Sequence, residues 1–171
     1  MTTRMIIGNL ISLLQVACLT LSCCAKTRRK VYALQMTEAS LSALATVFFG
    51  AWSGLTTVLI AIYRNWRTME DRFSAAEMVI TAVLTVVIGV AVNTNGFIGL
   101  FPILATLELT AFNHYAHGIR LTKVGILINV LLWCIYGFGI GNIVGGCGEM
   151  FTFVVGLISL LRSGRTEQAY T

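Results

Sequence analysis

A glutamate in the middle of a long apolar stretch is the residue of this chain best suited to carry chemistry. Glu108 lies about eleven residues into the apolar run 97–116, which as a helix places it near half the depth of a bilayer. A carboxylate at that depth is stable only when a proton or a partner neutralises it. Glu108 could therefore exchange a proton during transport, or it could be a protonated acid that is hydrogen-bonded between helices.

Two polar residues of other apolar runs could be the partner of Glu108. Its own helix face offers apolar neighbours, because the residues four positions before and after it are leucine and phenylalanine. A partner must therefore come from another helix, and Gln15 and Glu38 are the candidates. For Glu38, which lies nearer the basic end of its run, a structural ion pair with Lys30 or another basic residue is the favoured interpretation.

Glu149 is a further candidate for a solute or ion path. It follows the glycine-rich segment 145–148 near the predicted outer end of the last apolar run. There it could line an external vestibule, or it could be solvated at the membrane surface.

The rest of the sequence lacks the patterns typical of catalytic and metal sites. It contains no nucleophile–base pair and no His-Glu motif, and its five cysteines show no Cys-x-x-Cys spacing. We therefore expect that the protein is not an enzyme, that it has no catalytic residues, and that it binds neither a metal ion nor a cofactor.

The composition of the chain indicates a membrane protein. Of its 171 residues 57% are hydrophobic and 11% are charged, whereas soluble domains have about 25% charged residues. A chain this apolar cannot remain disordered in water either. What remains is a polytopic membrane protein whose partner is the lipid bilayer.

Seven apolar runs follow one another along the chain, separated by short polar segments. Together they predict an all-α fold of seven transmembrane helices in a single integral domain, residues 1–171. The third run is short, and it spans a bilayer only when its helix continues and Arg64 and Arg67 snorkel to the surface from the further turns. The runs are 5–24, 31–49, 51–63, 73–92, 97–116, 121–138 and 143–161.

The basic residues predict the orientation of the chain. With seven crossings, eleven of the twelve lysines and arginines fall on one side and only Arg4 on the other. Because cytoplasmic loops retain Lys and Arg, the N-terminus should lie outside and the C-terminus in the cytoplasm. The formal net charge of +5 is then an orientation signal, and nucleic acid is not expected as a partner.

The first and last three runs share an order of features that suggests an internal repeat. Each unit has a helix with a polar residue, Gln15 or Glu108, and then a basic turn that ends in Lys-Val at 30–31 or 123–124. The units 5–67 and 97–162 would form two parallel three-helix bundles, and the run 73–92 would be the helix that links them, in a 3+1+3 arrangement.

Several short segments resemble the bacterial inner-membrane proteins of the YgjV type. They are Ile-Gly at 7–8, the basic stretch 26–30, Phe-Phe-Gly at 48–50, and the segments 59–64 and 145–151. The resemblance covers nearly the whole chain. It implies a multi-pass protein of the bacterial inner (plasma) membrane, and it favours the vestibule as the position of Glu149.

The 3+1+3 arrangement is also similar to the SWEET and PQ-loop transporter fold. That similarity implies movement of a small solute along a central path, with Trp133 roughly where the carriers place a tryptophan that stacks on the substrate. The chain has no Pro-Gln pair, and Pro102 is its single proline. A sugar substrate and proline-hinged gating are therefore not implied.

The sequence is compatible with two functions of different classes. The first is a transporter of an unknown small solute, with Glu108, Gln15, Glu38, Trp133 and Glu149 along its path. The second is a membrane scaffold or assembly subunit that transports nothing. A polar, water-accessible cavity between the helices would favour the first, and a dry centre would favour the second. Association into a homo-oligomer is left open.

Overall fold

The protein folds entirely into helices joined by short turns. The computed structural model describes residues 3–168, and for 163–168 it describes the backbone alone. The helices are α1 (Thr3–Cys24), α2 (Arg28–Phe49), α3 (Trp52–Met69), α4 (Ala75–Ala91), α5 (Leu100–Tyr115), α6 (Ile119–Gly139) and α7 (Ile143–Gln168), with a short 3-10 helix η1 (Gly96–Gly99) before α5. The predicted all-α fold class is confirmed.

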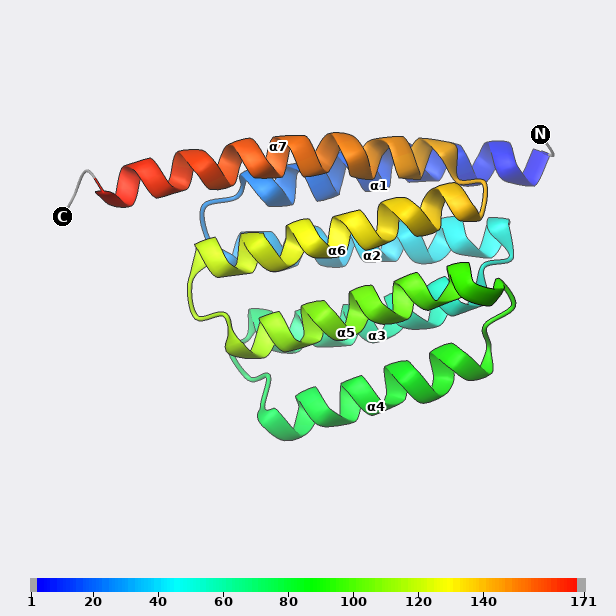
Figure 1. The fold of residues 1–171 in the computed structure, drawn as a ribbon, viewed down its shortest axis with the longest axis horizontal. Coiled ribbons are helices and arrows are strands. Elements are labelled where there is room, and N and C mark those ends of the chain that lie inside the picture. Colours follow the sequence, from blue (N-terminus) through cyan, green and yellow to red (C-terminus); the bar gives the residue numbers. More distant parts are fainter. Residues whose placement is uncertain (1–2, 169–171) are drawn as a thin grey trace.

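The helices form two layers that lie against each other (Figure 1). Helices α1, α2 and α3 form one row, and α7, α6 and α5 form the other. The rows touch at their margins, where α1 packs against α7 and α3 packs against α5. Helix α4 lies along one edge, where it packs against both α3 and α5. The middle of the bundle therefore lies between α2 and α6.

The distribution of side chains is inverted relative to a soluble protein. Among the described residues, 22 buried side chains are polar or charged and 17 are hydrophobic. Large apolar side chains instead cover the outside, as on α4, where Val79, Ile80 and Val83 are each more than half exposed. Such an exterior is unfavourable in water and favourable in hydrocarbon.

Four stretches of helix are long and apolar enough to cross a bilayer: Thr3–Cys24, Gly96–Tyr115, Ile119–Gly139 and Ile143–Arg162. Helix α4 is apolar but shorter, with 17 residues. The 22 residues of α2 would reach about 33 Å as a helix. Its low hydropathy comes from the three basic residues at its start and from Gln35 and Glu38, which line a cavity inside the bundle. The crossings of α2, α3 and α4 stay predictions.

The third helix continues past its apolar run. The apolar run was expected to end at residue 63, whereas α3 continues to Met69. The polar residues Arg64, Asn65 and Thr68 looked like the end of a helix, but all three are buried against the rest of the bundle. In the sequence, a polar residue on the inner face of a helix looks like the end of the apolar run, although the helix continues.

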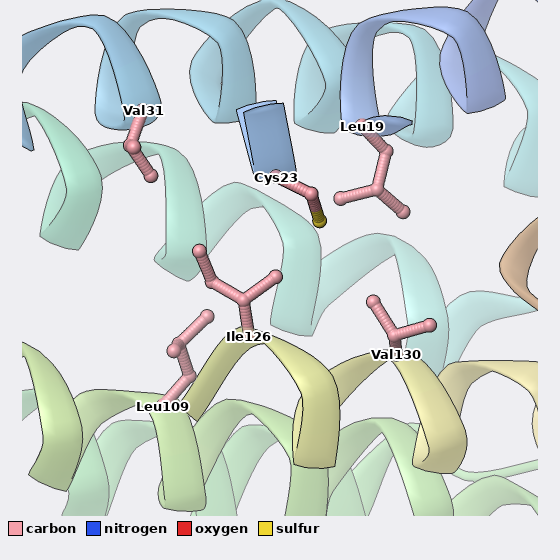
Figure 2. Close-up of a cluster of buried hydrophobic side chains, with 6 residues drawn as sticks. All are labelled: Leu19, Cys23, Val31, Leu109, Ile126 and Val130. Atoms are coloured by element: carbon pink, nitrogen blue, oxygen red, sulfur yellow. The ribbon is translucent and has the colours of Figure 1, made fainter. Parts of the chain in front are cut away.

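A compact apolar cluster fills the bundle toward its basic end. Its six buried members are Leu19, Cys23, Val31, Leu109, Ile126 and Val130, from α1, α2, α5 and α6 (Figure 2). Cys23 and Val31 flank the turn between α1 and α2 that carries the first basic residues. The cluster therefore closes the space between the two layers on this side.

Candidate functional site

A small polar cavity lies between the two layers. Its volume is about 30 Å³, which is room for about two water molecules, since one needs roughly 10–15 Å³. Helices of both layers contribute polar side chains to its lining. These are Gln35, Glu38, Arg64, Asn65, Thr106, Asn129, Trp133 and Glu149.

The spacing of polar residues along the helices explains why they meet there. On α2 the positions 32, 35, 38, 42 and 46 follow one another at intervals of three or four, which places them on one helical face. On α6, Asn129, Trp133 and Tyr136 follow the same interval. These faces point toward the opposite layer, while the lipid-facing sides carry leucine, valine and isoleucine.

A second, smaller cavity continues from the first toward the other end of the bundle. It measures about 20 Å³ and shares Trp133 and Glu149 with the first cavity. Its other polar lining residues are Gln15, Ser42, Thr46, Tyr136 and Asn142. Trp133 and Glu149 therefore stand between the two cavities.

Arg64 is the most buried charged side chain at the site, with 2% of its surface exposed. Its Nη1 donates to the carbonyl oxygen of Thr106 at 3.1 Å and to Oγ1 of Thr110 at 3.3 Å. Nε and Nη2 both donate to Oδ1 of Asn65, at 3.2 and 3.1 Å. The expectation that Arg64 snorkels to the membrane surface is wrong, because α3 continues past it and turns the side chain inward.

A chain of polar side chains runs from Arg64 toward the basic end of the bundle. The Asn113 amide lies 3.2 Å from the Asn65 amide and 3.3 Å from the Tyr32 hydroxyl. In its alternative orientation, Oδ1 of Asn113 accepts from Nε of Arg64 at 3.1 Å. The guanidinium of Arg28 lies 5.7 Å from the centre of the Tyr32 ring.

An open pocket of about 500 Å³ lies at that basic end. The residues that line it are Arg28, Arg29, Tyr32, Thr68, Met69, Glu70, Asp71 and Arg72. Arg28 and Asp71 form an ion pair across it at 3.8 Å. Tyr32 thus connects this surface pocket with the polar chain that leads to Arg64.

Glu38 faces the central cavity rather than a lysine at the surface. Its carboxyl group lies beside the Gln15 side chain and close to Arg64. Lys30 is exposed, and the ion pairs of the described residues join other groups, Arg28 to Asp71 and Arg67 to Glu77. The predicted ion pair of Glu38 with Lys30 is therefore wrong, because the rotation of α2 turns Glu38 inward.

Glu149 lies in the interior and not at an outer surface. It has 4% of its surface exposed, lines both cavities, and lies near enough to Glu38 for their charges to interact. Its Oε2 is buried and has no hydrogen-bond partner among the described residues. Neither the external vestibule nor the solvated surface position agrees with this placement, because α7 buries the face that carries Glu149.

Glu108 lies outside the two cavities. It is partly buried on α5 and close enough to Arg64 for their charges to interact. Neither of its carboxyl oxygens has a hydrogen-bond partner among the described residues. Of the five predicted path residues, the structure thus brings Gln15, Glu38, Trp133 and Glu149 to the cavities and leaves Glu108 beside them.

Sequence reasoning missed five polar residues of the larger cavity: Gln35, Arg64, Asn65, Thr106 and Asn129. A signal for Arg64 was present, because Thr57, Arg64 and Thr68 follow a helical interval and mark a polar face on α3. The described residues include no group of three or more His, Cys, Asp and Glu side chains that could hold a metal ion.

The apolar exterior and the polar interior define a multi-helix integral membrane protein. Residues 6–167 match the family Imp-YgjV, which is described as bacterial inner membrane protein, and the chain belongs to that family. The predicted resemblance is thereby confirmed, and the protein is surrounded by the lipid bilayer of the inner membrane. No curated protein and no solved structure matches the chain, so similarity to the SWEET and PQ-loop fold stays a prediction.

Proposed function

We propose that the protein transports a small solute along the space between its two helix layers. The observation that supports this most is the cavity with Arg64, Glu38 and Glu149 at the centre of the bundle. Charged side chains are costly inside a membrane protein and usually mark an ion or substrate path. A scaffold protein would gain nothing from them, because a dry apolar centre packs at lower cost.

We also propose seven crossings in a 3+1+3 arrangement, with the N-terminus outside and the C-terminus in the cytoplasm. The packing supports the duplication: exchanging α1, α2 and α3 for α5, α6 and α7 leaves the neighbouring pairs among these six helices unchanged. The pair α1–α7 becomes α5–α3, α1–α2 becomes α5–α6, and α2–α3 becomes α6–α7. Such a relation is expected of parallel repeats about an axis along the membrane normal. The three-helix units are rows that face each other, and α4 closes their edge.

The path we propose is closed in this conformation. The two cavities of about 30 and 20 Å³ admit water but not a solute of several heavy atoms. The apolar cluster around Ile126 separates them from the basic end. Transport therefore requires the layers to move apart at one end and then at the other, with the polar centre as the fixed site. The pocket of about 500 Å³ beside Arg28 is the cytoplasmic entrance in this scheme.

Flux into vesicles tests the transport function. Purified protein is reconstituted in liposomes, and uptake of radiolabelled amino acids, sugars, carboxylic acids and inorganic anions is compared with protein-free vesicles. We expect uptake of at least one class and a loss of tenfold or more in Glu38→Gln, because this change removes a charge from the cavity. Arg120→Gln, a change of an exposed charge that lines neither the cavity nor its entrance, should keep the wild-type rate.

Two outcomes contradict the proposal. One is folded protein that gives no flux above empty vesicles for any of the four solute classes. The other is an equal rate in wild type, Glu38→Gln and Arg120→Gln. Either result favours the scaffold function.

A further inference from the structure

We propose that Glu38 and Glu149 together hold one small monovalent cation, a proton or an alkali metal ion, at the junction of the two cavities. Both residues line the larger cavity, and their carboxyl groups lie near enough for their charges to interact. The role of this cation in coupling rests on the transport function proposed above. Its binding can be measured without transport.

The charges around the cavity require a counter-ion. Of the charged residues facing this region, α3 contributes Arg64 and α5, α2 and α7 contribute Glu108, Glu38 and Glu149. The cavity residues from α1 and α6 are uncharged, and the nearby thiols are Cys23 and Cys134. Three carboxyl groups thus face one guanidinium. In a medium of low polarity such an excess of negative charge is unstable unless protons or cations neutralise it.

Arg64 does not neutralise the Glu38–Glu149 pair by direct contact. Its nitrogen atoms are directed at Thr106, Thr110 and Asn65, at distances of 3.1 to 3.3 Å. Its described contacts are thus with neutral oxygen atoms, and the ion pairs of the described residues lie elsewhere. Another positive charge is therefore needed between the two carboxyl groups.

Unpartnered oxygen atoms mark where the cation would lie. Gln35 and Glu149 are each 4% exposed and line the cavity. Oε1 of Gln35 and Oε2 of Glu149 are buried without a hydrogen-bond partner among the described residues. Such orphaned acceptors are rare in folded proteins and are usually satisfied by a water molecule or an ion. Carboxylate and amide oxygens are the ligands that hard cations prefer.

The volume of the cavity limits the size of the ligand that it can hold. About 30 Å³ accommodates a hydrated proton, or an alkali metal ion with one water molecule, but not an organic cation. Glu108 also has unpartnered oxygens, but it does not line the cavity. The site therefore comprises Glu38, Glu149 and Gln35, and not Glu108.

The two carboxyl groups belong to opposite layers, and this gives the cation a mechanical effect. Glu38 is on α2 and Glu149 is on α7, so a cation between them attracts both layers toward each other. Without the cation, two carboxylates repel across the same gap. Binding therefore favours the closed arrangement of the layers, and release favours an open one.

The thermal stability of the purified protein in detergent tests the site. The melting temperature is measured from pH 6 to pH 9 with N-methylglucamine, sodium or potassium as the cation. Since a ligand that binds the folded state raises its stability, we expect a shift of about 5 °C between the loaded and the empty site. If the bound cation is a proton, the melting temperature of the wild type is lower at high pH than at low pH in every salt. If the bound cation is an alkali metal ion, sodium or potassium restores the melting temperature at high pH.

Variants separate this site from other ionisable groups. Glu38→Gln and Glu149→Gln should each remove the dependence on pH and on salt, whereas Glu70→Gln, an exposed carboxylate, should keep it. Should the glutamine variants not fold, the infrared band of a protonated carboxyl group in the wild type provides the readout. Raising the pH or adding sodium should then remove that band.

A wild type whose melting temperature and infrared spectrum respond neither to pH nor to salt would overturn the cation site. So would a response that is unchanged in both glutamine variants. Loss of solute flux together with an intact response removes the transport function and leaves the cation site in place. The two proposals are therefore distinguishable.

Discussion

Replacement of Arg64 by glutamine is expected to lower the stability of the protein more than any other charge-neutralising change, by about 3–5 kcal/mol, the usual cost of breaking a buried charge network. The change leaves the Glu38 and Glu108 carboxyl groups without a guanidinium nearby. It also removes the donors to the Thr106 carbonyl and to Asn65. Thermal or chemical unfolding in detergent measures the loss.

The matched control for Arg64 is Arg67, one turn further along the same helix. Arg67 pairs with Glu77 at 2.6 Å near the turn between α3 and α4, where the side chains are partly exposed. Arg67→Gln should cost clearly less, because exposed ion pairs contribute little. The double variant of Arg64→Gln with Glu38→Gln should recover part of the lost stability, since it also removes a negative charge. Equal losses for Arg64→Gln and Arg67→Gln would contradict the buried position.

The second large effect is expected from Ile126→Ala in the apolar cluster (Figure 2). Ile126 is 1% exposed and packs among Leu19, Val31 and Leu109. Truncation of a fully packed side chain leaves a cavity and costs about 2–5 kcal/mol. Because the cluster separates the polar cavities from the basic end, the variant should also leak protons faster than the wild type in reconstituted vesicles.

Leu131→Ala is the control for this effect. Leu131 lies on the same helix but is 44% exposed on the outside of the bundle. Its truncation should change the melting temperature and the proton leak little. An Ile126→Ala variant that melts and leaks like Leu131→Ala would show that the cluster does not seal the path.

The helices could be predicted from the sequence because lipid-facing residues dominate the apolar runs. The predicted run 31–49 became Arg28–Phe49, and 121–138 became Ile119–Gly139. The error at the end of the third run has a physical cause. Hydropathy treats Arg64 and Asn65 as a boundary, but the bundle supplies Thr106 and Thr110 as partners for the buried guanidinium.

Part of the candidate site could be predicted from the sequence, but the pairings of its residues could not. Gln15, Glu38 and Glu149 were conspicuous as polar residues inside apolar runs, and all three line the cavities. Lys30 is not the partner of Glu38, whose nearby basic residue is Arg64, and Glu149 lies inside the bundle rather than at its outer end. Both errors concern the rotation of a helix about its axis, which depends on packing against other helices. A single sequence does not show how a helix is rotated about its axis when the helix carries only a few polar residues.

The proposed path requires water to reach the space between the two layers. Cysteine labelling tests this access most directly. In a variant that lacks the five native cysteines, Ala61→Cys places a thiol in the cavity lining, and Leu59→Cys places one on the lipid-facing side of the same helix. A methanethiosulfonate reagent reacts with the thiolate form of cysteine, and a thiol ionises only where water is present. We expect the cysteine at position 61 to react at least tenfold faster than the one at 59, because the reagent reaches the cavity lining when the layers move apart, whereas the closed cavities admit only water. Equal rates, or an inert thiol at position 61, would contradict this expectation.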